Sequence, residues 1–149
     1  TAHEIAEIFH LDKASATNGC TMAVNIVHNM ERSSNTEDKI DLAITLPSSF
    51  IERYCSRLNI NNELTVLSNF IAKKVEDKNL ITDNIPHAIA AGIVYFVSHN
   101  CHLDVSKSDI KTICGVSEVT INKCFKKLET MKQQLIPKII ISKYNCKME

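Results

Sequence analysis

The stretch DNIPHAIAAGIVYFVSHN, residues 83–100, is the segment from which the fold can be predicted. Its middle, AIAAGIVYFV, is apolar on every side, and a helix of this kind lies buried at the centre of a protein. Asp83 is a candidate N-cap, and Pro86 suits a first helical turn. The small side chains of residues 90–92, AAG, allow neighbouring helices to approach closely. We therefore expect a central helix here.

Amphipathic segments flank this helix on both sides, with apolar residues recurring every three or four positions. Together with the central helix they predict five helices between residue 46 and about residue 131. The chain has only 3 Gly and 3 Pro, and this low content of turn formers favours an all-α fold with short connections. The flanking segments are LPSSFIERYCSRLNI (46–60), NNELTVLSNFIAKKVEDKN (61–79), VSKSDIKTIC (105–114) and VSEVTINKCFKKLETM (116–131).

The ends of the chain differ from this regular part. Residues 1–30 predict two helices, the second of them capped by Asp12. Residues 31–45 are polar and indicate a linker. We expect a helical unit over 46–132 and a tail over 133–149, in which the apolar run at Ile139–Ile141 has no assigned use.

Charge and cysteine usage narrow the class of protein. Residues 105–149 carry nine lysines and four acidic residues, a balance of +5, against −5 for residues 1–104. A basic end indicates an anionic partner, although a solvated lysine-rich terminus gives the same pattern. The six cysteines form no CxxC pair and suit reduced core residues of an intracellular protein; they are Cys20, Cys55, Cys101, Cys114, Cys124 and Cys146.

No apolar run is long enough to span a membrane, and the start lacks the pattern of a signal peptide. The chain begins inside a helical pattern, which indicates a fragment of a longer protein.

A helix-turn-helix is predicted where the last two regular segments meet. Ile110 and Cys114 face inward, Gly115 supplies the turn, Val116 fills the corner, and Ser117 caps the second helix. Glu118 suits the positive end of the helix dipole. The inward stripe of the second helix is Ile121, Cys124, Phe125 and Leu128.

The outward face of this second helix carries side chains that can contact DNA bases and phosphates. Val119 can contact a thymine methyl group, Asn122 can pair with adenine, and nearby lysines can reach phosphates. A plain solvated helix face explains the same residues. The candidate DNA-binding residues are Ser117, Val119, Thr120, Asn122, Lys123, Lys126, Lys127, Lys107 and Lys111.

The whole series resembles the second cyclin-like repeat of the transcription factor IIB family. The matching segments, in the family's order and spacing, are LPSSFIERYCSRLNIN, NFIAKKVEDKNLI, IPHAIAAGIVYFVS and DIKTICGVSEVTINKCFKKLE. HEIAEIFHLDKASATNGC, near the start, is similar to the last two helices of the family's first repeat. It also loosely echoes SDIKTICGVSEVTINKC, as two copies of one unit would.

The resemblance implies an all-α fold with one complete cyclin-like five-helix repeat and part of another. It implies a general transcription initiation factor that binds the TATA-binding protein and promoter DNA and recruits a multisubunit RNA polymerase. The family reads DNA beside the TATA box through a valine and an arginine. Val119 matches the valine, whereas Asn122 replaces the arginine, so the base preference is open. The family's zinc ribbon is absent from this chain, and we expect no cofactor.

The composition, rich in Asn, Ile and Lys, suits an AT-rich genome, and a large DNA virus is one candidate source. The expected location is intracellular: the nucleus for a cellular protein, and a cytoplasmic replication site or the virion for a viral one.

Two other functions were weighed. A cyclin-like scaffold that binds proteins and no DNA explains the helices but not the basic end. An enzyme or metal protein is disfavoured, because no phosphate loop, nucleophile or paired-carboxylate motif is present. His99, Cys101 and His102 lie close in sequence, but zinc takes about four ligands and no second pair follows. Histidines at a helix end also favour the helix dipole. We expect no catalytic site, metal, small-molecule substrate or membrane contact.

Overall fold

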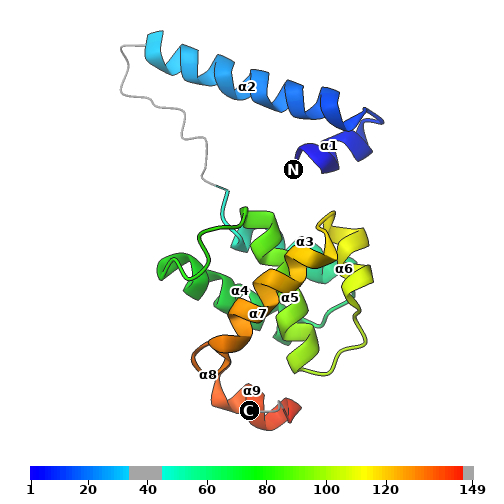
Figure 1. Cartoon of the computed structure of the whole chain (residues 1–149), viewed down its shortest axis with the longest axis vertical. Helices are drawn as coiled ribbons and strands as arrows, with labels where there is room; N and C mark the ends of the chain where they lie inside the picture. Colours follow the sequence, from blue (N-terminus) through cyan, green and yellow to red (C-terminus); the bar gives the residue numbers. More distant parts are fainter. Residues whose placement is uncertain (34–44, 146–149) are drawn as a thin grey trace. The chain divides into compact units, whose positions relative to one another are not determined.

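The structure, a computed structural model, describes residues 1–33 and 45–145, and every regular element in them is a helix (Figure 1). The predicted all-α fold is thus confirmed. The chain divides into two compact units, Thr1–Ile44 and Thr45–Glu149. Most of the expected linker, residues 34–44, lies outside the described residues. No helix in the described part is long and apolar enough to cross a membrane.

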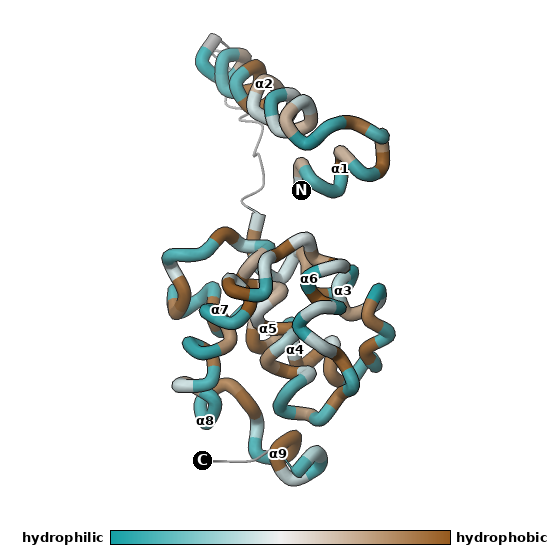
Figure 2. Tube along the Cα trace, turned by 45° about the vertical axis from the view of Figure 1, so that its right-hand side comes forward, coloured by the Kyte–Doolittle hydropathy of each residue, from teal (hydrophilic) through white to brown (hydrophobic). Residues whose placement is uncertain are grey.

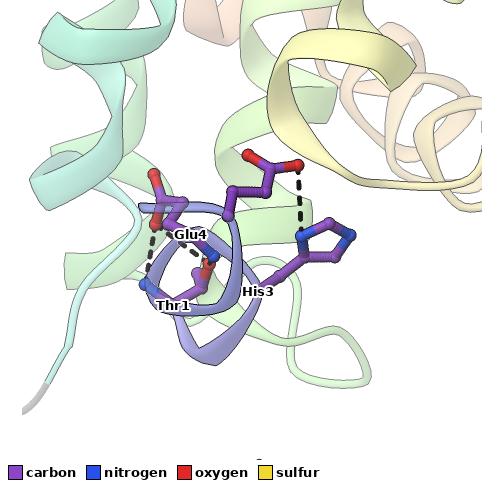
Figure 3. A network of polar contacts seen from close by, with 4 residues as sticks. Thr1, His3 and Glu4 are labelled. Carbon is purple, nitrogen blue, oxygen red and sulfur yellow. Dashed lines mark hydrogen bonds and ion pairs between the residues drawn. The ribbon is translucent and has the colours of Figure 1, made fainter. Parts of the chain in front are cut away.

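The first unit begins with α1 (Ala2–Ile8), which is held at its start by a capping box. The Glu4 amide donates to the Thr1 hydroxyl (3.2 Å), and the Glu4 carboxylate accepts from the Thr1 backbone nitrogen (2.7 Å) (Figure 3). One turn further on, His3 Nδ1 lies 3.5 Å from a carboxylate oxygen of Glu7. These local contacts fix the first turn of α1.

The second helix of this unit, α2 (Lys13–Ser33), extends three residues into the segment expected to be a linker. Asp12 caps it as predicted, because its carboxylate accepts from the Ser15 amide at 2.9 Å. This bonding to Ser15 holds the pKa of Asp12 below its ordinary value. In the described part of the unit only Ala6 and Ala16 are buried apolar residues. Two helices with so small a core carry little stability of their own.

The second unit contains the predicted five-helix series, each helix within a few residues of its expected bounds. The central helix α5 packs against four others, and its apolar positions run through the middle of the unit (Figure 2). Its predicted position as the hub is confirmed. Asp83 is not its N-cap: that position is Ile85, which offers no side-chain cap, and Pro86 opens the first turn. The series is α3 (Ser48–Arg57), α4 (Asn62–Asp77), α5 (Pro86–Asn100), α6 (Lys107–Cys114) and α7 (Glu118–Thr130).

Helices α5 and α7 cross at close range at Gly92. A Cβ atom built on Gly92 would lie 2.3 Å from the Cβ atom of Cys124, far inside van der Waals contact. Only a residue without a side chain fits at this point, as the small residues at 90–92 predicted. The backbone of α7 therefore lies directly on α5.

Helix ends in both units share one chain-reversing geometry. A residue with positive φ follows the helix, and the next residue, always apolar, donates its amide to the carbonyl five positions earlier. This Schellman pattern satisfies helix-end carbonyls. In the second unit the apolar residue is partly buried against the core, whereas Leu11 in the first unit is 49% exposed. The positive-φ residues are His10, Asn59, Asn79 and His102, and the amide pairs are Leu11 to Ala6, Ile60 to Cys55, Leu80 to Val75 and Leu103 to Ser98.

The expected tail folds as two short helices, α8 (Lys132–Leu135) and α9 (Lys138–Tyr144). Leu135 and Ile136 are buried in the core, while Ile139 is 79% exposed. Lys143 Nζ and the Tyr144 hydroxyl both donate to the Glu63 carboxylate on α4, at 2.6 and 2.8 Å. These bonds, Lys143 foremost, hold the pKa of Glu63 below its ordinary value.

Replacing Gly92 by alanine tests the crossing of α5 and α7. We expect Gly92→Ala to lower the free energy of unfolding by about 1–3 kcal/mol, because a methyl group must displace α7. Urea unfolding followed by circular dichroism measures the change. Gly19→Ala is the matched control, since Gly19 is also helical but has open space around it. There alanine should keep or raise helix content. Equal stability of Gly92→Ala and the unchanged chain would contradict the close contact.

Candidate nucleic-acid interface

The predicted helix-turn-helix is present and consists of α6, a three-residue turn and α7. Gly115 ends α6 with a left-handed backbone (φ 65°) and donates its amide to the Lys111 carbonyl at 3.0 Å. Glycine adopts this conformation without strain. Val116 is buried in the corner, as predicted. The turn thus fixes the angle between the two helices.

Both helices of the motif have side-chain caps. Ser106 and Asp109 form a capping box at α6, with the Asp109 amide donating to Ser106 Oγ (3.1 Å) and the Ser106 amide donating to the Asp109 carboxylate (2.8 Å). Bonds from Ser106 hold the pKa of Asp109 below its ordinary value. At α7 the Thr120 amide donates to Ser117 Oγ (3.2 Å), which confirms the predicted cap.

The inward face of α7 is packed as the sequence predicts, with Ile121, Cys124 and Leu128 fully buried. Phe125 is partly buried and meets three rings of α5. Its centroid lies 5.1 Å from that of Tyr95 and 5.2 Å from that of His99, both edge-on, and 6.3 Å from that of Phe96. Such pairs add to the burial energy of the rings. This packing leaves the opposite face of α7 outward.

The outward face carries one apolar residue among polar ones. Val119 is 66% exposed. Lys123 and Lys126 are exposed on the same helix. Neither makes an ion pair within the described ranges. Thr120 is engaged locally, its hydroxyl 2.9 Å from that of Ser117.

The remaining three candidate lysines have partners within the chain. Lys111 Nζ lies 3.6 Å from the Glu118 carboxylate across the turn. Lys127 donates to the Asp83 carboxylate, which precedes α5. This bond, aided by the positive charge of Lys123, lowers the pKa of Asp83.

Lys107 bridges three helices. Its Nζ donates to Asn122 Oδ1 at 3.1 Å and lies 5.3 Å from the ring centroid of Tyr95, a cation–π distance. The structure thus brings Lys107 and Asn122 together at one edge of α7.

Three residues of this surface escaped the sequence prediction: Asp83, Tyr95 and Ser106. Asp83 is of a residue type that often caps helices, and its partner Lys127 lies far away in sequence. Tyr95 looks like one more core residue of the apolar helix. Ser106 could have been found, since SKSD has the spacing of a capping box.

The cysteine and histidine residues near the end of α5 do not come together. Cys101 is buried, the His99 ring stacks with Tyr95, and a ring nitrogen of His102 lies 3.5 Å from the Asn145 carbonyl. Among residues 1–33 and 45–145, no group of three metal-binding side chains is found. The cysteines described are not disulfide-bonded, and all but Cys20 are buried.

The fold and this motif define a class of protein: an all-α, cyclin-like repeat that ends in a helix-turn-helix. A family model described as the transcription factor TFIIB repeat matches residues 40–131. The chain therefore belongs to the transcription factor IIB family, as the sequence motifs predicted.

Relatives come from a virus, a eukaryote and an archaeon. An Acanthamoeba polyphaga mimivirus protein described as a putative transcription initiation factor IIB-like protein is 29% identical over 136 residues, 91% of this chain and 29% of the relative. Transcription initiation factor IIB of Encephalitozoon cuniculi is 32% identical over 104 residues, 68% of this chain and 33% of the relative. Transcription initiation factor IIB of Methanosarcina mazei is 30% identical over 89 residues, which are 60% of this chain and 26% of the relative. The chain thus spans at most about a third of these relatives.

Removing the cap of α7 should loosen the start of the outward face. We expect Ser117→Ala to lower the free energy of unfolding by about 1 kcal/mol, because the Thr120 amide loses its acceptor. Ser117→Asp is the control, since it keeps an acceptor and suits the helix dipole. Chemical unfolding measures both, and hydrogen exchange at Thr120 localises the effect. If Ser117→Ala and Ser117→Asp are equally stable, the hydroxyl is not a cap.

Proposed function

We propose that this chain is part of a general transcription initiation factor and binds promoter DNA through α7. The observation that carries the proposal is the exposed Val119 beside Lys123 and Lys126 on a capped, well-packed second helix. Residues 119, 122, 123 and 126 share one helix face because they are three or four positions apart. An outward helix with amines beside an apolar contact suits the major groove.

Within this proposal eight of the nine candidate residues have the following roles. Val119 and Asn122 face base edges, while Lys123 and Lys126 contact phosphates directly. Lys111 and Lys127 reach phosphates only after leaving their carboxylate partners. Ser117 and Thr120 hold the first turn of α7, and their hydroxyls and amides lie at its positive end.

The proposed partners follow from the family and from the names of the relatives. We infer binding to the TATA-binding protein and recruitment of a multisubunit RNA polymerase, with no enzymatic activity and no cofactor in this chain. The site of action is intracellular, and the mimivirus relative fits a viral source. A virus-encoded factor should recruit the virus's own polymerase in pull-downs; recruitment of a cellular polymerase alone would contradict this source.

A cyclin-like scaffold that binds protein and no DNA is the alternative. This alternative does not explain why Lys123 and Lys126 are exposed on α7. The buried hub and the capped turn suit either function, so only a nucleic-acid measurement separates them.

The main test uses fluorescence anisotropy on a TATA-containing duplex, with and without the TATA-binding protein, at several salt concentrations. We expect binding in the ternary mixture. Lys123→Ala with Lys126→Ala should weaken it and reduce the slope of log K against log salt by about 1.8, as two lost phosphate contacts require.

The matched control is Lys73→Ala with Lys78→Ala, which removes the same charge from exposed lysines of α4 and its end. The control should bind as the unchanged chain does. Equal binding by both double variants, or no DNA binding by the folded chain, would favour the scaffold.

The Asp83–Lys127 pair should weaken DNA binding. We expect Asp83→Asn to raise affinity by about two- to fivefold, the scale of one exposed ion pair, because Lys127 becomes free for a phosphate. The salt slope should steepen by about 0.9. Asp77→Asn makes the same charge change on the exposed end of α4 and serves as control. An affinity unchanged by Asp83→Asn would show that Lys127 does not reach DNA.

A further inference from the structure

An apolar groove runs along α4 on the side where the C-terminal segment of the chain meets this helix. It encloses about 320 Å³ and is lined by Glu63, Val66, Leu67 and Phe70 of α4 and by Pro137 and Ile140. The α4 residues share one helix face because they are three or four positions apart. Val66 and Phe70 remain 59% and 41% exposed. The chain itself therefore fills the groove only in part.

The two ends of the groove carry opposite charges. Glu63 supplies a carboxylate at one end. Lys74, about three helical turns further along α4, places its Nζ 4.5 Å from the centroid of the Phe70 ring and donates to the Gln134 carbonyl at 2.9 Å. A segment that fits this groove must therefore offer a cation toward Glu63 and an acceptor toward Lys74.

The segment from Gln134 to Tyr144 meets this requirement in part. Lys143 and Tyr144 donate to the Glu63 carboxylate at one end, and Gln134 accepts from Lys74 at the other, so the segment runs antiparallel to α4. Helix α9 lies at the edge of the unit, beyond α8, and none of its residues, all of which are described, is buried (Figure 1). Its bonds to Glu63 are exposed to solvent, and exposed pairs of this kind stabilise a fold only slightly. Helix α9 is therefore a weakly held occupant of one end of the groove.

We propose that this groove is a docking site for an amphipathic helix of a partner protein, and that α9 is a displaceable cover over one end of it. The partner helix carries an acidic residue near its start, a basic residue near its end and apolar side chains between them. When it lies antiparallel to α4, this helix pairs with both Lys74 and Glu63. Its apolar side chains bury Val66 and Phe70, as apolar residues three or four positions apart do when a helix binds a groove. The order of its charges also suits the helix dipole.

This docking site is separate from the proposed DNA-binding face, since none of its lining residues belongs to α6 or α7. Because α9 is tethered beside the groove, it competes with a partner at a high effective concentration. A cover that is seated about nine-tenths of the time weakens the apparent affinity of the partner about tenfold. Release of α9 should therefore strengthen docking.

The test titrates the full chain into a fluorescein-labelled peptide that is stapled to hold its helix, because so short a helix is marginal by itself. The peptide ends in IIISKY, as residues 139–144 do, and carries a glutamate about three helical turns before the lysine. Lys143→Ala combined with Tyr144→Phe removes both bonds to Glu63 and releases α9. Fluorescence anisotropy should show that the peptide binds this double variant about tenfold more tightly than the unchanged chain.

Two substitutions in the released chain separate groove binding from adhesion to the surface. Val66→Lys places a charge against the apolar side chains of the peptide and should weaken binding about tenfold or more. Asn69→Lys adds the same charge to α4 outside the lining residues and should leave binding unchanged. A second peptide, in which the glutamate and the lysine are exchanged, should bind about fivefold more weakly, because each end of the groove then meets a like charge. Circular dichroism checks that each variant is folded.

Each contrary outcome removes a stated part of the proposal. No peptide binding by the folded double variant would overturn the docking site, and so would equal binding of the charge-exchanged peptide or equal binding by Val66→Lys. Equal affinity of the unchanged chain and the double variant would overturn the role of α9 as a cover. Light scattering should show a monomeric double variant. A dimer that the peptide dissociates would show that the groove takes a second copy of this chain, and would overturn the partner helix.

Discussion

The contact of Gly92 with Cys124 sets the geometry on which the outward face of α7 depends. With no side chain at Gly92, α7 lies directly against the buried hub helix, and the Phe125 ring can reach Tyr95 and His99. This packing of α7 on α5 determines which face of α7 points outward. Val119 is exposed because the other side of the same helix is filled, so the surface chemistry follows from one glycine in the core.

The basic character of the motif is partly offset by nearby carboxylates. Of the five candidate lysines, Lys111 and Lys127 already face acidic partners, and Lys107 is bound to Asn122. Among the described residues, Lys123 and Lys126 are the candidate lysines that are exposed and make no ion pair or hydrogen bond. If the proposed function holds, such a surface should bind DNA weakly by itself, as expected of a factor that acts together with a DNA-bound partner.

Much of the fold could be predicted because its signals are local. The apolar run at 83–100 marks a buried helix, Gly115 and Ser117 mark the turn, and Asp12 marks a helix start. Each of these depends on residues within a few positions. The end of α2 was placed too early, since the polar residues near position 31 gave no sign that the helix continues.

The features that were missed join distant parts of the chain. The sequence predicted Asp83 as a helix N-cap, yet Asp83 pairs with Lys127, 44 positions away. The tail had no assigned use, yet Lys143 binds Glu63 across 80 positions. No periodicity or motif encodes such pairs, because they arise only when packing brings the helices together. The Lys107–Asn122 bond, 15 positions apart, belongs to the same group.

The buried thiols have a practical consequence for following this protein in solution. Cys55, Cys114 and Cys124 lie on three different helices, α3, α6 and α7, and all are shielded from solvent. Burial raises the pKa of Cys55 and of Cys124, so little reactive thiolate forms near neutral pH. Each thiol should react only after the helices packed around it open locally. Alkylation rates, resolved by peptide mass, would thus report local opening around each cysteine without any introduced label.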